Sequence, residues 1–146
     1  MDESVVKELN AVLKGEHMAL DAYERFIQEV DDDKVKNEFK NIQSDHRKHI
    51  KELISRIENL GGKPESSTGF AGFMASAKAI TDKIGSRDTV DIIKNAYDGE
   101  DKGIGMVEEI IKGDLDNKSL DIVKGMLKED HDHLKTMAHM ISRYEH

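Results

Sequence analysis

A chain of 146 residues is long enough for one hydrophobic core but too short for two ordinary domains, so we expect a single domain over residues 1–146. Its composition, with 36% charged residues, 5% aromatic residues and one proline, is typical of long helices and disfavours sheets. The net charge of -8 argues against nucleic acid as a partner, and the absence of cysteine leaves only histidine and carboxylates as metal ligands.

The sequence also lacks the features of a membrane or secreted protein. No apolar run approaches the length of a membrane-spanning helix, and the first residues carry neither the basic nor the apolar part of a signal peptide. We therefore expect a cytoplasmic protein without a membrane partner. Its acidic balance suits cations as ligands.

The first predicted element is a helical hairpin over residues 4–60. Apolar residues recur at steps of three and four over 6–30 and again over 35–60, which indicates two amphipathic helices. The three aspartates at 31–33 are interpreted as a helix-capping turn, because the glycine and terminal glutamate of a calcium loop are not in position. Glycine and proline at 61–64 end the hairpin.

A long connection and a second hairpin follow. Residues 61–87 are predicted as a crossover with a short helix at roughly 70–84, and the second hairpin covers 88–145. Adjacent antiparallel helices are usually joined by roughly two to eight residues. The much longer crossover therefore predicts that the helix after it runs parallel to the helix before it.

The two hairpins are internal repeats of each other. A shift of 84 positions aligns them without a gap, so that Gly15-Glu16 meets Gly99-Glu100 and His49 meets His133. Apolar positions would coincide in any helical bundle, but these polar identities would not. The sequence therefore predicts two similar halves.

Six polar residues interrupt the apolar stripes at one height of the predicted bundle. In each hairpin a glutamate lies sixteen residues before the turn, and two further polar residues lie fourteen and seventeen residues after it. At ~1.5 Å per residue these positions differ by no more than roughly 5 Å along the axis. The candidate metal ligands are Glu16, His46, His49, Glu100, Asp130 and His133. Buried carboxylates need a partner or a metal, because an unpaired one is costly.

Alternatives to this ligand set remain open. A metal-free cluster of hydrogen-bonded Glu–His pairs would also satisfy buried polar groups. Asp45 and Glu129 each precede a candidate ligand by one residue, and they could replace it as partners of His49 and His133 on the same helix.

Other polar residues have simpler interpretations. Tyr23 lies two helical turns from Glu16, about 10 Å along the axis, which is too far to bind the same metal from the same helix. It is expected to be a core aromatic residue. The remaining histidines fall beside the stripes and are expected at the surface: His17, His131, His139 and His146.

Several of these motifs carry a family resemblance that extends over nearly the whole chain. They are Gly15-Glu16-x-x-Ala19-x-x-x-Tyr23-x-x-Phe26, His49, Gly99-Glu100 and Asp130-x-x-His133. The sequence resembles the ferritin-like superfamily, of the rubrerythrin and bacterioferritin type. The Leu60-Gly61-Gly62-Lys63-Pro64 element and the crossover after it resemble, more specifically, a bacterial ferritin-like domain family of unknown function with an LGGxP element after the second helix.

This resemblance implies an all-α, ferritin-like four-helix bundle with a metal site at mid-height. Such sites use one glutamate from each of two helices and Glu-x-x-His from each of the other two. His46 and Asp130 stand where that pattern has glutamate. Replacement of one bridging carboxylate by a neutral imidazole leaves three negative ligands, which favours a single metal or two metals of unequal affinity.

The resemblance also implies a function. It indicates a non-haem metal protein in oxygen, peroxide or iron handling, with di-iron as the expected cofactor and manganese or zinc as alternatives. Fold alone does not decide whether it is an enzyme, such as a peroxidase or ferroxidase. Without cysteine the chain has no rubredoxin centre, so a redox activity would need a separate electron donor. A homo-oligomer is possible, and the alternative function is a metal-free structural or partner-binding bundle.

Overall fold

Four helices make up the described part of the chain. The computed structural model describes residues 2–66 and 88–145, and the short helix predicted at roughly 70–84 lies outside these ranges. The helices are α1 (Asp2–Glu29), α2 (Asp33–Asn59), α4 (Thr89–Ile110) and α5 (Asn117–Tyr144). The predicted all-α fold class is confirmed, and none of the described helices is long and apolar enough to span a membrane.

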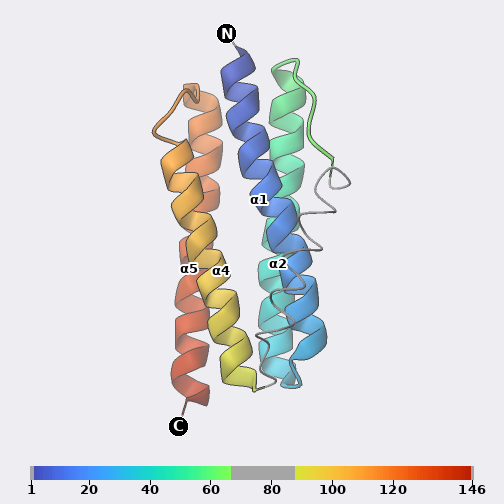
Figure 1. Ribbon diagram of the computed structural model, residues 1–146, viewed down its shortest axis with the longest axis vertical. Helices are drawn as coiled ribbons and strands as arrows, with labels where there is room; N and C mark the ends of the chain where they lie inside the picture. The colour runs from blue at the N-terminus through green and yellow to red at the C-terminus, as the bar shows by residue number, and fades with distance from the viewer. Residues whose placement is uncertain (1, 67–87, 146) are drawn as a thin grey trace.

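The helices form a bundle of two antiparallel hairpins. α1 packs against α2, α4 packs against α5, and the hairpins meet through α1 with α4 and α2 with α5. Figure 1 shows that α2 and α4 run in the same direction, with the end of α2 and the start of α4 at opposite ends of the bundle. The predicted parallel arrangement of these two helices is therefore confirmed.

The turn between α1 and α2 is a helix cap, as the sequence predicts. Asp32 is the N-cap of α2, and its Oδ1 accepts a hydrogen bond of 3.0 Å from the backbone N–H of Val35. The other carboxylate oxygen, Oδ2, accepts a bond of 2.8 Å from the Tyr144 hydroxyl at the end of α5. The cap thus also ties the second hairpin to the first.

The two consecutive glycines after α2 have separate structural reasons. Gly61 has a φ of 81°, which favours glycine, and its N–H bonds to Glu58 O while the Gly62 N–H bonds to Ile57 O. This pattern is a Schellman cap. A Cβ on Gly62 would lie 2.7 Å from the side chain of Val6, so a larger residue would push α1 away. The glycine pair therefore fixes both the end of α2 and its fit against α1.

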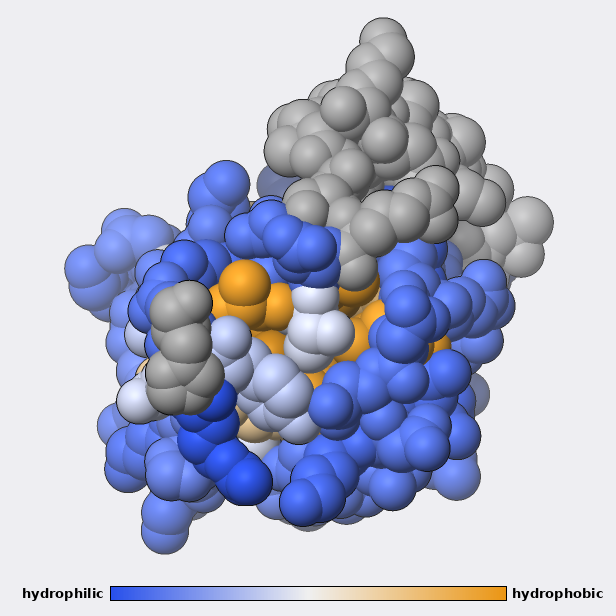
Figure 2. Space-filling model, turned by 90° about the horizontal axis from the view of Figure 1, so that it is seen from below, coloured by the Kyte–Doolittle hydropathy of each residue, from blue (hydrophilic) through white to orange (hydrophobic). Residues whose placement is uncertain are grey.

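The buried apolar side chains form two clusters, one towards each end of the bundle. The lower cluster includes Tyr23, Phe39 and Met137, and the upper cluster includes Leu13, Leu53 and Val123. Figure 2 views the lower end of the bundle, where hydrophobic side chains lie in the middle and hydrophilic ones surround them.

Candidate metal centre

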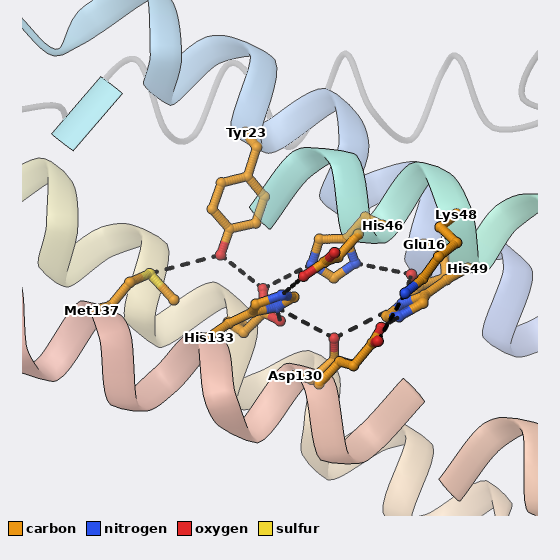
Figure 3. Close-up of polar contacts among 11 residues, drawn as sticks. Glu16, Tyr23, His46, Lys48, His49, Asp130, His133 and Met137 are labelled. Carbon is orange, nitrogen blue, oxygen red and sulfur yellow. Dashed lines mark hydrogen bonds and ion pairs between the residues drawn. The ribbon is translucent and has the colours of Figure 1, made fainter. Parts of the chain in front are cut away.

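A layer of six polar side chains lies between the two apolar clusters, and Figure 3 gives a close-up of the polar contacts there. Its members are Glu16 from α1, His46 and His49 from α2, Glu100 from α4, and Asp130 and His133 from α5. We call these six residues the polar layer. Each is buried, with at most 7% of its surface exposed. The structure thus brings together all six residues that the sequence singled out.

Within each half, one histidine points its Nδ1 atom at the glutamate of its own hairpin. His49 Nδ1 lies 2.8 Å from Glu16 Oε1, and His133 Nδ1 lies 2.9 Å from Glu100 Oε2. These two contacts correspond to each other under the 84-residue repeat. Both histidines therefore present Nδ1 towards the centre of the layer.

The outer nitrogens of the same two histidines bind carboxylates of the opposite half. His49 Nε2 lies 2.6 Å from Glu129 Oε1 on α5, and His133 Nε2 lies 2.8 Å from Asp45 Oδ2 on α2. Glu129 is held in turn by Lys48, whose Nζ lies 2.8 Å from Oε2. Histidines that bind metals commonly donate their other N–H to a carboxylate, which fixes the tautomer and the ring orientation. Asp45 and Glu129 occupy that outer position.

His46 departs from this symmetry because both of its nitrogens contact glutamates of the polar layer. Nδ1 lies 2.9 Å from Glu16 Oε1, and Nε2 lies 3.0 Å from Glu100 Oε1. The ring stacks on Tyr23, with centroids 5.6 Å apart and planes inclined by 22°. The Tyr23 hydroxyl also donates a 2.7 Å hydrogen bond to Glu100 Oε1. His46 therefore links α1 to α4 across the bundle.

Asp130 is the member of the polar layer with an unsatisfied atom. Its Oδ1 is buried and has no hydrogen-bond partner among the described residues, although His133 Nδ1 lies 3.5 Å away and His49 Nδ1 lies 4.0 Å away. Figure 3 shows Asp130 between these two histidines. A buried acceptor without a partner costs roughly 1–3 kcal/mol. The position of this oxygen suits a ligand that supplies positive charge.

The two glutamates are held in their charged form. Burial alone would raise the pKa of Glu16, but hydrogen bonds from His46 and His49 outweigh it and lower that pKa. Burial likewise opposes ionisation of Glu100, and hydrogen bonds from His133 and His46 lower its pKa well below the usual range. The layer therefore offers two anionic carboxylates near neutral pH.

The other titratable groups shift upwards. Burial alone would lower the pKa of His46, but Glu100 and Glu16 raise it well above 6.5. Burial is also outweighed at His49 and His133, where hydrogen bonds to Glu16 and Glu100, respectively, raise the pKa. Burial and repulsion from the two glutamates raise the pKa of Asp130 to about 8. In the metal-free chain protons thus supply the positive charge of the layer.

We expect the free energy of unfolding of the metal-free protein to fall as the pH rises from about 5 to about 8.5. The slope is up to about 1.4 kcal/mol per pH unit for each proton that the folded chain keeps and the unfolded chain has lost. A raised folded-state pKa contributes stability that is lost above the unfolded-state value, which is 3.8 for Asp130 and 6.5 for His46. The lowered pKa of Glu16 acts only below 4.5. Urea unfolding after chelation measures the trend, and stability that increases with pH would contradict it.

The donor set of the polar layer is compatible with a metal site. One ligand atom from each of His46, Glu100, Asp130 and His133 lies within 4.8 Å of the others. Glu16 joins His46 and His49 in a second group of this kind. Imidazole nitrogen with carboxylate oxygen suits iron, manganese and zinc. Because the unpartnered Asp130 oxygen faces this group, the residues fit a divalent cation.

The structure brings the six predicted residues together at one height, but the carboxylate neighbours of the histidines differ from the alternative that the sequence left open. The sequence leaves open that Asp45 and Glu129 pair with the histidine of their own helix, whereas in the structure each contacts the histidine of the opposite half. The contact of Tyr23 with Glu100 was also missed, although a tyrosine in an apolar stripe needs a partner for its hydroxyl. No feature of the sequence indicates the contact of Lys48 with Glu129.

The remaining histidines lie outside the polar layer. His131 and His139 are exposed, as expected, and His131 lies 3.7 Å from Glu108. His17 differs from expectation, since it is half-buried and its Nε2 has no hydrogen-bond partner among the described residues. His146 lies outside the described residues.

The fold and the buried polar layer define a ferritin-like four-helix bundle, and solved structures share this fold. A dodecameric thioferritin, the bacterioferritin-related protein of Bacteroides fragilis, matches 98% of this chain and 87% of its own, with a TM-score of 0.80 and 20% identity. A two-domain protein of Anabaena variabilis ATCC 29413, with DJ-1/ThiJ/PfpI-like and ferritin-like domains, matches 95% of this chain with a TM-score of 0.76 and 20% identity. The chain spans only 36% of that protein.

The chain belongs to the family described as Domain of unknown function (DUF2383), whose family model matches residues 4–113. This match includes the first hairpin, the crossover and α4. No significant match to a curated protein was found. Membership in this family leaves the function to be argued from the polar layer.

Proposed function

We propose that this chain is a non-haem metal protein of the ferritin-like type, whose polar layer holds iron or, alternatively, manganese and serves oxygen, peroxide or iron handling. The observation that carries the proposal is the unpartnered, buried Oδ1 of Asp130 amid histidine nitrogens and glutamate oxygens. A redox metal bound there would supply electron transfer and Lewis acidity. The similarity in fold to a bacterioferritin-related protein supports iron as the first choice.

The chain's own residues would prepare the site in three ways. Carboxylates of the polar layer supply negative charge, and an imidazole of the layer supplies a nitrogen ligand. Asp45 and Glu129 hold the outer nitrogens of the histidines. The apolar clusters on both sides of the layer exclude water, which strengthens the electrostatic interactions inside it.

Two further aspects of the proposal concern partners. Because the chain has no cysteine, electrons for peroxide reduction would come from a separate donor. The Bacteroides fragilis protein is a dodecamer, which supports assembly of this chain into a homo-oligomer as well.

A second candidate function is a metal-free bundle that acts by binding a partner. It is favoured by one observation: each ring nitrogen of His46, His49 and His133 already has a carboxylate partner. A polar network satisfied in this way can hold a core together without metal. Metal content therefore decides between the two candidates.

We expect untagged protein purified without chelator to retain up to about two metal ions per chain, and to bind ferrous iron or manganese when reconstituted anaerobically. Affinity should fall as the pH decreases from about 8 to 6, because the raised pKa values of His49 and His133 let protons compete already near neutrality. Elemental analysis and calorimetric titration measure both.

The exposed variant Glu52→Gln provides a control for nonspecific binding to acidic surface residues. Glu52 lies on α2 like two members of the polar layer, but outside the layer. It should leave metal content unchanged. A parent protein that retains no metal at any pH between about 6 and 8.5 would favour the metal-free candidate.

A further inference from the structure

The two halves of the polar layer differ in what they offer to a cation. Under the 84-residue repeat, Glu16 corresponds to Glu100 and His49 to His133, but His46 corresponds to Asp130. The half around α5 therefore has two carboxylates and one imidazole, whereas the half around α2 has one carboxylate and two imidazoles. Two carboxylates neutralise a divalent ion, and one leaves a buried positive charge uncompensated.

The distances in the α5 half suit a single ion. Ligand atoms bound to one ion at about 2.1 Å with angles of 90–109° lie about 3.0–3.4 Å apart. His133 Nδ1 lies 2.9 Å from Glu100 Oε2 and 3.5 Å from Asp130 Oδ1. The Asp130 Oδ1 atom accepts no hydrogen bond from the described residues. An ion could therefore bind this oxygen without breaking a hydrogen bond of Asp130 within the described part of the chain.

The α2 half is already occupied by the His46 ring. Both nitrogens of His46 are bonded to glutamates of the layer, and Tyr23 stacks on its face. His46 can become a ligand only if it breaks its link to Glu16 or to Glu100. His133, in contrast, keeps its outer bond to Asp45 when Nδ1 turns from a hydrogen bond to a metal.

We propose that the polar layer binds one divalent cation per chain, through Glu100, Asp130 and His133, and that His46 fills the place of a second ion by linking Glu16 to Glu100. The proposal rests on the metal-binding function proposed above and narrows it to a mononuclear site. His46 is then a positioning residue and not a ligand. His46 stands where the ferritin-like pattern has a bridging glutamate. On this proposal, that difference changes the number of bound ions from two to one.

Manganese alone is the probe for this proposal, because Mn²⁺ is stable in air and its electron paramagnetic resonance spectrum distinguishes isolated ions from coupled pairs. Metal-free protein is titrated with MnCl₂, and free and bound Mn²⁺ are counted. We expect one Mn²⁺ per chain with the spectrum of an isolated ion. A parent protein that binds two ions per chain, with a coupled spectrum, overturns the mononuclear proposal but leaves the metal-binding function intact.

Matched variants of the two halves test the assignment independently. Glu100→Gln and Asp130→Asn should raise the dissociation constant about 100-fold or more. Glu16→Gln and His46→Gln should each keep one bound Mn²⁺, and His46→Glu should add a second ion and a coupled spectrum. Circular dichroism and thermal melting verify that each variant folds.

The outcomes separate the two levels of the proposal. Loss of all binding in folded His46→Gln, or equal losses in Glu16→Gln and Glu100→Gln, overturns the mononuclear assignment. A parent that binds neither Mn²⁺, Fe²⁺ nor Zn²⁺ overturns the proposed function itself. The stoichiometry of the parent decides the central point even if a variant fails to fold.

Discussion

Replacement of Glu100 by alanine should lower the free energy of unfolding of the metal-free protein by about 3–5 kcal/mol. Glu100 accepts one hydrogen bond of 2.7 Å from the Tyr23 hydroxyl, and it contacts His46 at 3.0 Å and His133 at 2.9 Å. Its removal leaves three buried polar groups without this partner, in a layer that water cannot reach easily. Urea unfolding of parent and variant, after chelation, measures the loss.

Two comparison variants separate the charge of Glu100 from its shape. Glu100→Gln keeps the volume and one acceptor oxygen, so it should lose less stability than Glu100→Ala while it still weakens metal binding about 100-fold or more. The exposed Glu52→Ala on α2 should change stability by no more than about 0.5 kcal/mol. If Glu100→Ala unfolds at the same urea concentration as the parent, the hydrogen bonds of the polar layer contribute little to stability.

Replacement of Asp45 by asparagine should weaken metal binding about 10- to 100-fold, because Asp45 holds the outer nitrogen of His133 at 2.8 Å. An asparagine can still accept through its oxygen, but it loses the negative charge that orients the ring and raises its basicity. Calorimetric titration with Mn²⁺ measures the change. Asp45 has intermediate exposure, so the variant should fold like the parent.

Glu129→Gln is the matched variant in the other half, since Glu129 corresponds to Asp45 under the repeat and holds His49. With the ion in the α5 half, its effect on affinity should be smaller than that of Asp45→Asn. Glu129→Gln also removes the ion pair with Lys48. Because the Lys48 side chain is exposed, the loss of this pair should change stability little. Unchanged affinity in Asp45→Asn would show that the outer carboxylate does not support the ligand.

The sequence was sufficient to predict the bundle and the positions of the layer residues. Helical periodicity gave the hairpins, and the length of the crossover gave the parallel arrangement of α2 and α4, since the chain has few ways to connect such helices. Glu16 and Glu100 could be placed at one height with the histidines because the rise of a helix is fixed and each hairpin has a clear turn. These predictions depend only on spacing.

Contacts between helices were harder to predict because they depend on rotamers and on distances between axes. Asp45 lies beside the apolar stripe of α2, and its reach to His133 follows only from how closely α2 and α5 approach. Tyr23 is too far from Glu16 along α1, but the rise of one helix sets no limit on its reach to Glu100 on antiparallel α4. Sequence spacing within a helix carries no information about such pairs.

The crossed bonds between halves have a consequence for how such a site can diversify. His49 relies on Glu129 and His133 relies on Asp45, so neither hairpin completes its histidine alone. Two identical hairpins paired as a homodimer would make the same crossed contacts, but every substitution would then appear twice, once in each half. Because both hairpins here belong to one chain, position 46 could become histidine while position 130 became aspartate. Covalent linkage of the hairpins is therefore what permits an asymmetric centre inside a nearly symmetric bundle.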